Sequence, residues 1–406
     1  MEILEELYLP ESWQDFFSYK KEQQNLTRQE QKKIQEYIEQ KRYIPILDAI
    51  FKEEFLVPIP CKKEISKGGT GKKRTIYFYP EDFNIFLKMV TYKLYRYDFL
   101  FEKNCYAFRK DYGVRNAIQT IRQTKKLSEK YCLKVDIHDY FNSIDVDILL
   151  NKLQFLNERD FYLYKLFEQV LRADRAVVSS GKREWVIEEK RGAMAGTPSS
   201  PFFANLYLSD VDSYFAEREV EYFRYSDDIL ILCDDLGKLE ELREQLYERL
   251  KEKHLQLNPS KFYTGKVRDT CEFLGFSFDG RGTIDLSENT KKKMKKKIKR
   301  KAHALRRWSD KKNLSYEKAA KGFIKAMNKK FFDGGGEKEF SWSRFYFPLL
   351  TTVDGLREID CYMQEYIRYC VTGRHYKGNY RIDYDRLKEW GYRNLVHEFY
   401  AGKKRQ

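Results

Sequence analysis

The sequence contains few of the residues that hold metals through nitrogen or sulfur. Its 406 residues include seven cysteines and five histidines, and no two cysteines have the Cys-x-x-Cys spacing of zinc and redox sites. The histidines are scattered along the chain. These features argue against a zinc centre or a disulfide framework, and they favour the reducing cytoplasm as the compartment.

Long apolar runs and a signal sequence are also missing. No stretch approaches the roughly 20 apolar residues of a membrane-spanning helix. Residues 1–20 lack the pattern of a signal peptide. We therefore expect a protein that has no membrane partner.

A nucleotide-binding P-loop is missing as well. Residues 67–74 are basic and glycine-rich, but the Gly-Lys-Ser/Thr ending and a following helix are absent. An alternating strand, residues 75–79, comes next instead. The segment predicts either an anion cradle at the entrance of a strand or an ordinary hairpin tip with solvated lysines.

Positive charge and aromatic rings, by contrast, are abundant. The net charge is +15, and 16% of the residues are aromatic. A basic chain rich in Tyr and Phe fits a nucleic-acid partner, whose phosphates attract the charge and whose bases stack on the rings. A ribosome-associated or membrane-surface protein would show the same charge balance.

The most basic stretch, residues 291–301, holds nine basic side chains in eleven positions. Apolar residues within and after it keep a helical spacing: Met294, Ile298, Ala302 and Leu305. The pattern predicts a packed helix that lays a basic face along a nucleic-acid backbone, rather than a disordered tail.

A loop rich in Gly, Pro and Ser, residues 191–201, precedes an apolar stretch with helical periodicity at residues 202–215. Pro201 suits a first helical turn. The stretch predicts a single helix whose N-terminus is able to contact phosphate or the backbone of a base pair.

Two β-prone runs flank a short acidic break at Ser226-Asp227-Asp228. Aromatic and β-branched residues on both sides predict a tight hairpin with the two carboxylates at its tip. Adjacent ionised carboxylates repel each other, and each raises the pKa of the other. A hard divalent cation with oxygen ligands would remove this conflict. The alternative is a solvated turn, as we expect for a second acidic pair, Asp234-Asp235.

A third carboxylate, Asp136, lies about ninety residues earlier, in a strand-like run with Leu133, Val135 and Ile137. An unpaired charge in such surroundings would be costly. The run and the acidic hairpin can lie side by side in one sheet. Three carboxylates with two cations would then orient an attacking 3′-hydroxyl and stabilise the leaving pyrophosphate.

Taken in order, these blocks resemble those of a reverse transcriptase over nearly the whole chain. The resemblance assigns the first catalytic motif to Asp136 and the backbone of Ile137. It assigns the signature tetrapeptide to residues 225–228, with Tyr225 under the primer end. It implies an RNA template, dNTPs, a cDNA product and two Mg²⁺ ions, whose ligands would be Asp136, Ile137, Asp227 and Asp228.

The same resemblance gives roles to residues around the acidic site. Phe141 matches the aromatic steric gate, a ring that would clash with a ribose 2′-hydroxyl. Lys261, after Leu-Asn-Pro-Ser, matches the lysine that protonates pyrophosphate. The triphosphate contacts fall on Lys72 and Arg74, with Lys73 as a weaker candidate.

Other family blocks match the fingers, the loop behind the base pair and the primer grip. Residues 104–113 are similar to the fingers motif of the group II intron and retron branch, and residues 273–276 to the primer grip. Residues 196–201 match the loop that backs the nascent base pair. Relatives usually have Gln-Gly where this chain has Ala195-Gly196, so the amide near the incoming sugar is missing.

Within the family, the chain is most similar to bacterial enzymes of the group II intron and retron-like branch. Residues 371–373 are Val-Thr-Gly, as in retrons, but the matching Asn-Ala-x-x-His block is absent. We expect no nuclease, maturase or integrase-like extension after the thumb. The closing segment, residues 391–400, resembles defence-associated (anti-phage) reverse transcriptases, which implies a dedicated structured non-coding RNA as template.

The resemblance implies an α+β, right-hand polymerase fold with fingers, a palm with an antiparallel sheet backed by helices, and a helical thumb-like region. We expect an N-terminal helical extension at residues 1–43, fingers and palm at 44–281, and a basic helical region at 282–406. An RNA-binding scaffold without catalysis, a retron-type enzyme and an RNA-templated RNA polymerase remain as alternatives. The oligomeric state and the primer, whether RNA, DNA or a protein hydroxyl, are left open.

Overall fold

The computed structural model of the chain describes residues 2–23, 26–66, 73–181, 183–189, 192–279, 282–333 and 341–404. Contacts divide the chain into two compact units. The first comprises Met1–Thr120 and Tyr131–Thr264, and the second comprises Ile121–Lys130 and Gly265–Gln406. The three regions expected from the sequence stay a prediction, since compactness alone does not define fingers, palm and thumb.

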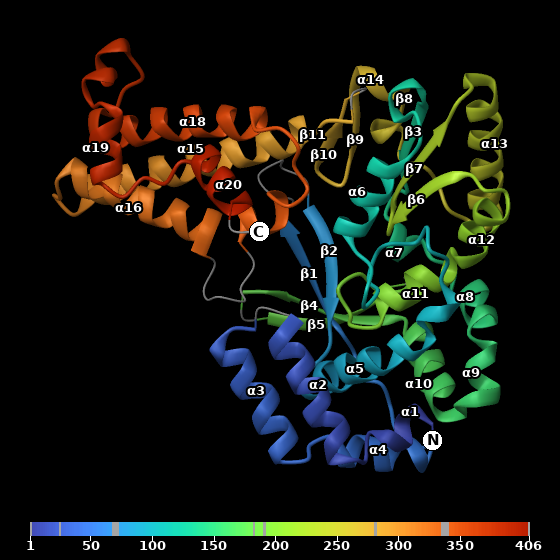
Figure 1. The fold of residues 1–406 in the computed structure, drawn as a ribbon. Helices are drawn as coiled ribbons and strands as arrows, with labels where there is room; N and C mark the ends of the chain where they lie inside the picture. Colours follow the sequence, from blue (N-terminus) through green and yellow to red (C-terminus); the bar gives the residue numbers. More distant parts are fainter. Residues whose placement is uncertain are drawn as a thin grey trace. The chain divides into compact units, whose positions relative to one another are not determined.

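The first unit combines helices with two sheets (Figure 1). Its helices are α1 (Ile3–Glu6), α2 (Pro10–Gln23), α3 (Arg28–Glu39), α4 (Ile44–Phe51), α5 (Glu81–Lys93), η1 (Leu94–Leu100), α7 (Tyr140–Ser143), α8 (Val146–Lys152), α9 (Gln154–Arg159), α10 (Phe161–Arg172), α11 (Ser200–Tyr207), α12 (Ser209–Glu217), α13 (Leu236–Glu252) and η3 (Pro259–Lys261). Helix α6 (Val114–Gln123) runs across the boundary between the units.

One sheet of this unit has the strand order β2-β1-β4-β5. Its strands are β1 (Cys61–Ser66), β2 (Lys73–Phe78), β4 (Arg175–Ser180) and β5 (Arg183–Glu188). The pairs β1–β2 and β4–β5 are antiparallel, and β1 meets β4 in parallel at Cys61 and Val177.

The other sheet has the order β6-β7-β3-β8. Its strands are β3 (Tyr131–Asp136), β6 (Glu221–Tyr225), β7 (Asp228–Cys233) and β8 (Tyr263–Lys266), the last of which crosses the unit boundary. Both β6 and β3 pair with β7 in antiparallel register. The predicted acidic hairpin is therefore confirmed as β6–β7, and the strand that carries Asp136 lies next to it (Figure 1).

The two faces of this sheet differ because successive side chains of a strand point to opposite faces. Leu133 and Val135 of β3 and Ile229 and Ile231 of β7 occupy one face, and all four belong to the hydrophobic core. Leu239, Leu242, Leu246 and Leu250 of α13 belong to the same core. The opposite face carries Asp136 and Asp228.

The apolar stretch after the Gly/Pro/Ser loop differs from its prediction. It forms two helices, α11 and α12, separated at Leu208, whose φ of −104° and ψ of 9° leave the helical range. The helix start is as expected, with Pro201 in the first turn. The break lets α12 take its own direction, with Phe215 stacked on Tyr222 of β6 at 4.7 Å between ring centroids.

The second unit consists of a small sheet and a helical part. Its strands are β9 (Cys271–Phe273), β10 (Phe276–Phe278) and β11 (Ile284–Leu286), in the antiparallel order β11-β10-β9. Its helices are η2 (Leu127–Glu129), α14 (Val267–Thr270), α15 (Glu288–Lys311), α16 (Tyr316–Asn328), η4 (Lys329–Asp333), α17 (Trp342–Tyr346), α18 (Asp354–Thr372), η5 (Lys377–Arg381), α19 (Tyr384–Glu389) and α20 (Leu395–Lys403).

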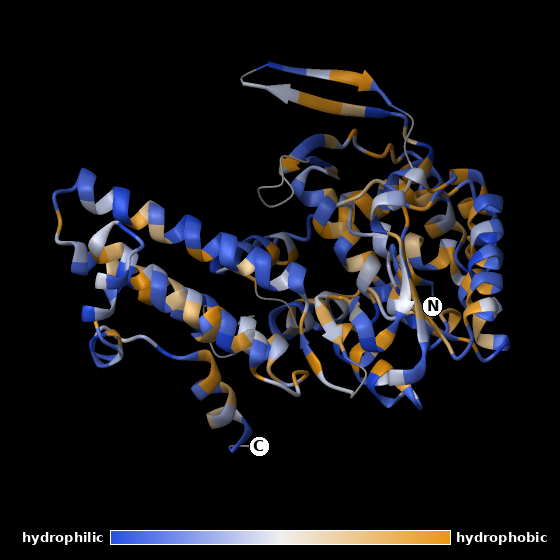
Figure 2. Ribbon diagram, turned by 90° about the horizontal axis from the view of Figure 1, so that it is seen from above, coloured by the Kyte–Doolittle hydropathy of each residue, from blue (hydrophilic) through white to orange (hydrophobic). Residues whose placement is uncertain are grey.

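The predicted basic helix is confirmed as α15. Met294, Ile298 and Ala302 are buried, and the helix packs against α16 and α18. Most of its lysines are exposed, and long hydrophilic stretches run along the helices of this unit (Figure 2). Every helix in the described ranges is too short or too polar to cross a bilayer.

Candidate active site

The acidic turn joins β6 to β7 and faces the end of β3. Asp228 lies opposite Tyr225 in the hairpin and opposite Asp136 across the next pair of strands. Residues in direct register project from the same face of a sheet. Tyr225, Asp136 and Asp228 therefore share the face away from the hydrophobic core.

Asp227 is held in the turn by backbone contacts. The amide of Ile137 donates a hydrogen bond to the carbonyl oxygen of Asp227 at 3.0 Å. Ser226, immediately before it, has a φ of +60°, a left-handed conformation that is uncommon for residues other than glycine. The turn is thus attached to the end of β3 at the point where Asp136 sits.

The charges at the turn repel one another. Burial, followed by the charge of Asp136, raises the pKa of Asp227. Burial, followed by the charge of Asp227, raises the pKa of Asp228 to about 6. Both shifts mean that the ionised forms are disfavoured in the folded chain.

Asp136 is the most deeply buried of the three carboxylates, with 3% of its surface exposed. The ammonium of Lys261 forms an ion pair with its Oδ2. Asn258 donates from Nδ2 to its Oδ1 at 3.2 Å and from its backbone amide to the Asp136 carbonyl at 2.8 Å. The structure therefore brings Lys261 to the acidic site, where the resemblance places it.

The donor set suits a hard divalent cation, although it is not assembled as a complete cluster. Within the described ranges, no group of three or more His, Cys, Asp and Glu side chains is spaced to hold a metal ion. In the same part of the chain, neither Asp227 nor Asp228 has a cation at ion-pair distance, and both have raised pKa values. Carboxylate oxygens whose charges lack compensation are the ligands that Mg²⁺ prefers, so the residues fit a divalent cation.

Aromatic rings line the site beside the carboxylates. Phe108 lies between Tyr225 and Phe141, with ring centroids 6.3 Å and 6.2 Å away respectively. Phe108 has a φ of +58° and is 41% exposed. The sequence had placed Phe141 and Tyr225 at the site but had given Phe108 no role.

The loop at Ala195-Gly196 packs on β2. The amide of Tyr77 donates to the Ala195 carbonyl at 2.8 Å. A Cβ on Gly196, which has a φ of +102°, would lie 2.9 Å from the Tyr77 carbonyl oxygen. Only glycine therefore permits this close approach without a shift of the strand.

Arg74, on the same strand, is exposed, and its positive charge lowers the pKa of Asp227. Of Lys72 and Arg74, the two main candidates for binding the triphosphate, the structure describes only Arg74. Arg74 lies within electrostatic reach of the acidic turn, whereas Lys72 lies outside the described residues.

Asn258 was assigned no role from the sequence, although its position carries a signal. It lies in the Leu-Asn-Pro-Ser-Lys run that led to Lys261. Its side chain caps η3 by accepting from the Ser260 amide at 3.2 Å. Asn258 thus caps the start of the helical turn that carries Lys261 and also binds Asp136.

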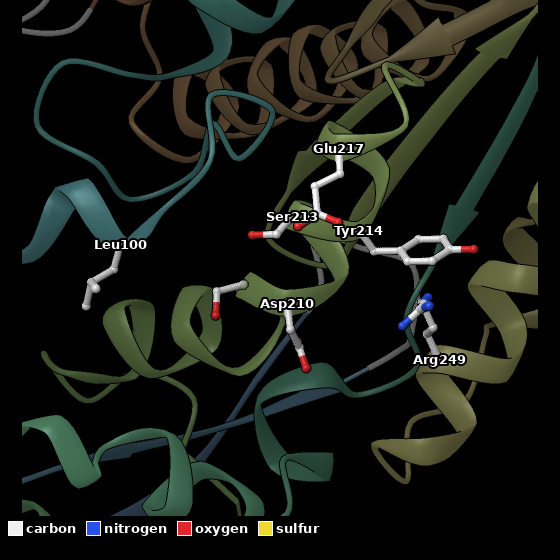
Figure 3. A pocket seen from close by; sticks show the side chains of 7 residues that line it. Leu100, Asp210, Ser213, Tyr214, Glu217 and Arg249 are labelled. Carbon is white, nitrogen blue, oxygen red and sulfur yellow. The ribbon is translucent and has the colours of Figure 1, made fainter.

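A pocket of the first unit lies on α12, and none of its lining residues was assigned to the site by sequence (Figure 3). The guanidinium of Arg249 lies over the ring of Tyr214, 3.3 Å from its centroid. The other residues that line the pocket are Leu100, Ser209, Asp210, Ser213 and Glu217.

Comparison with known proteins gives one family match. The family described as "Reverse transcriptase (RNA-dependent DNA polymerase)" matches residues 62–278. No curated protein matches the sequence.

Among solved structures, the chain is similar to yeast telomerases. The Candida albicans telomerase in complex with a fragment of telomeric RNA shares 13% identity at a TM-score of 0.49, over 87% of this chain and 68% of that one. The truncated apo telomerase from Candida tropicalis shares 13% identity at a TM-score of 0.45. That match covers 57% of this chain and 55% of the telomerase.

Asp228→Asn is expected to stabilise the protein in metal-free buffer. At pH 8 the wild-type carboxylate is ionised, because its pKa is about 6. The amide removes a buried charge, and with it the repulsion from Asp227 and Asp136, and should raise the free energy of unfolding by roughly 1–2 kcal/mol. Thermal unfolding in EDTA measures the change, with the exposed Asp234→Asn as control. A lower midpoint for Asp228→Asn than for the control would show that the repulsion is already relieved.

Proposed function

The chain belongs to the reverse transcriptase family, whose match covers more than half of it, and on that premise we propose that it makes cDNA at the site formed by Asp136, Asp227 and Asp228. The chain is an RNA-directed DNA polymerase by class, with the α+β right-hand fold of such enzymes. The observation that carries the proposal is the register of β3 against β7. It places a buried carboxylate directly opposite the acidic turn.

Each residue of the site has a proposed role that its position allows. Asp136, Asp227 and Asp228, with the backbone of Ile137, would hold two Mg²⁺ ions. When bound, such ions neutralise the charge that develops on the attacking hydroxyl and the leaving pyrophosphate. Tyr225 shares a sheet face with Asp136 and Asp228 and would support the primer end.

Lys261 is placed to act on the leaving group. Its side chain is 55% exposed, and its ammonium reaches the buried Asp136. A flexible stem of this kind lets the ammonium turn from Asp136 towards pyrophosphate and donate a proton there.

Phe141 acts as the gate against ribonucleotides. Its ring lies beside that of Phe108, with the centroids 6.2 Å apart, and a ribose 2′-hydroxyl would clash with it. Arg74 and Lys72 would bind the triphosphate, and Ala195-Gly196 would lie under the incoming sugar. Because Ala195 has no side-chain amide, contacts to the sugar would depend more on the backbone of this loop.

For the biological role, we propose anti-phage defence with a dedicated structured non-coding RNA as template. Support comes from the resemblance of residues 391–400 to defence-associated enzymes and from the charge of +15. The telomerase from Candida albicans was solved with a fragment of its telomeric RNA. A structured RNA partner agrees with the exposed lysines of α15, and the cytoplasm stays the predicted compartment.

The rival function is an RNA-binding scaffold without catalysis. A scaffold gains nothing from burying three mutually repelling carboxylates, because their ionised forms cost stability. The raised pKa values of Asp227 and Asp228 therefore favour the enzyme over the scaffold.

Asp227→Ala is expected to abolish cDNA synthesis and leave RNA binding intact. The loss of one carboxylate should lower dNTP incorporation by about 10³-fold or more. Asp234→Ala, at an exposed carboxylate beyond the same hairpin, serves as the control and should retain wild-type rates. Undiminished synthesis by Asp227→Ala would reject the proposal. Phage protection should fall with the same variant, and unchanged plaque numbers would reject the defence role.

Phe141→Ala is expected to raise the use of rNTPs relative to dNTPs, because the smaller side chain leaves space for a 2′-hydroxyl. Primer extension with each nucleotide class measures the ratio. Phe99→Ala, at a ring that is 70% exposed, is the matched control. An RNA-templated RNA polymerase would instead show high rNTP use in the wild type and no change in the variant.

Neutralising Lys292, Lys296 and Lys299 of α15 is expected to weaken RNA binding and flatten its dependence on salt. The three exposed lysines follow one another at helical spacing, so they form one face. The slope of log K against log salt should fall by about 2 to 3, since each of the three phosphate contacts contributes roughly 0.7 to 0.9. Binding titrations at several salt concentrations test this. An equal slope for the variant and the wild type would mean that this face of α15 does not contact the RNA.

The control for this triple variant neutralises Lys52, Lys238 and Lys251, which are exposed lysines of the first unit. It removes the same net charge. If both triple variants lowered the slope equally, net charge rather than the face of α15 would account for binding.

A further inference from the structure

Arg224 is a charged residue that the function proposed above leaves unexplained. It precedes Tyr225 in β6, so its side chain points to the core face of the sheet. Neither Arg224 nor Asp212 of α12 has any exposed surface. The guanidinium donates to both carboxylate oxygens of Asp212, from Nε at 2.7 Å and from Nη2 at 2.5 Å.

Stability alone does not account for this ion pair. Two apolar side chains of similar volume usually stabilise a protein as well as a buried ion pair does, because the charges lose their hydration. The ion pair therefore suggests that the guanidinium of Arg224 has a further role at this position in β6. The remaining hydrogen bonds of Arg224 indicate what this role is.

Those hydrogen bonds reach the acidic turn and the helix before α12. Nη1 donates to the carbonyl oxygen of Ser226 at 3.4 Å and to Oδ1 of Asn205 at 3.5 Å. Nη2 also contacts the Asn205 carbonyl at 3.4 Å. Asn205 in turn donates to the Ala107 carbonyl at 2.7 Å. One guanidinium thus connects the turn to α11 and α12.

The backbone of Arg224 is bound as well. Its amide donates to the Asn104 carbonyl, and its carbonyl accepts from the Tyr106 amide, both at 2.9 Å. Nη2 contacts the sulfur of Cys105 at 3.2 Å. The segment that carries Phe108 is therefore attached to the same residue.

The turn needs external support. Ser226 adopts a left-handed conformation with a φ of +60°, which a side chain disfavours. Its hydroxyl is buried and has no hydrogen-bond partner in the part of the chain that the structure describes. The side chain of Ser226 therefore does not hold its own turn, and Asp227 follows directly.

We propose that Arg224, fixed by Asp212, is a positioning residue that holds the carbonyl of Ser226 and thereby aims Asp227 and Asp228 at Asp136. The inference rests on the proposed polymerase function for its role in the reaction. A displacement of about 1 Å at a reacting group is enough to lower a rate by about 10²-fold. Arg224 itself touches neither substrate nor cation.

The main test uses Arg224→Lys in the full-length chain. Lysine keeps a positive charge beside Asp212 but has no second nitrogen to reach Ser226. We expect a lower thermal midpoint, because buried oxygens of Asp212 and Asn205 lose donors, and in the folded variant an unchanged KM for dNTP with a 10- to 100-fold lower kcat. We also expect Mn²⁺ affinity, measured by electron paramagnetic resonance without substrate, to fall at least 5-fold. Wild-type kcat and wild-type Mn²⁺ affinity in this variant would overturn the inference.

A second variant separates positioning from charge. Arg224→Met with Asp212→Leu replaces the pair by apolar side chains, and the same losses of kcat and Mn²⁺ affinity are expected. Adding Ser226→Gly should restore at least 5-fold of the lost rate, because glycine adopts the left-handed turn without support. If glycine restored nothing, Arg224 would not act through this turn.

A matched control removes another ion pair from α12. Lys152 and Lys253 both pair with Asp210, which lies in the pocket of Figure 3. Replacing all three, with Asp210→Leu, Lys152→Met and Lys253→Met, should leave kcat and Mn²⁺ affinity unchanged, and equal losses in this control would overturn the specific role of Arg224. If neither the wild type nor any variant incorporated dNTPs, the proposed function would be rejected. The Mn²⁺ affinities would still show whether Arg224 positions the carboxylates.

Discussion

Repulsion among three carboxylates is the constraint on which the rest of the site depends. Asp136 and Asp228 stand opposite each other on neighbouring strands, and Asp227 adjoins them in the turn. Burial and mutual charge raise the pKa values of the two turn residues. A fold that keeps such groups together must hold them rigidly and supply positive charge. Lys261 supplies one such charge to Asp136 in the structure, and divalent cations would supply the rest.

The remainder of the first unit resists this repulsion. The core face of the sheet is apolar except for Arg224 and packs in the same core as α13, which fixes the strands. The Ile137 amide binds the turn from β3, and Arg224 binds it from the core side. On the opposite face the carboxylates lie at the end of the strands, beyond the buried Leu230 and Leu232. If these carboxylates act as we propose, stability and function oppose each other here, as they often do at catalytic sites.

The sequence allowed the acidic site to be predicted because period-2 alternation sets which side chains share a face. Asp136 among apolar strand residues and the hairpin at 226–228 were both recognisable in this way. The partner of Arg224 was not, because Asp212 lies on a helix and no periodicity links the two. The break at Leu208 was missed because leucine favours helix, whereas the packing of α12 against β6 is set by tertiary contacts. Phe108 was missed because ring contacts between distant segments leave no local pattern.

The most direct test of the account is to sequence the nucleic acid that co-purifies with the wild-type chain and with Asp227→Ala. The account predicts that the wild type carries one structured RNA together with DNA complementary to it. The variant should carry the same RNA without the DNA. Complementary DNA in both preparations, or RNA alone in both, would contradict the claim that Asp136, Asp227 and Asp228 form the site of cDNA synthesis.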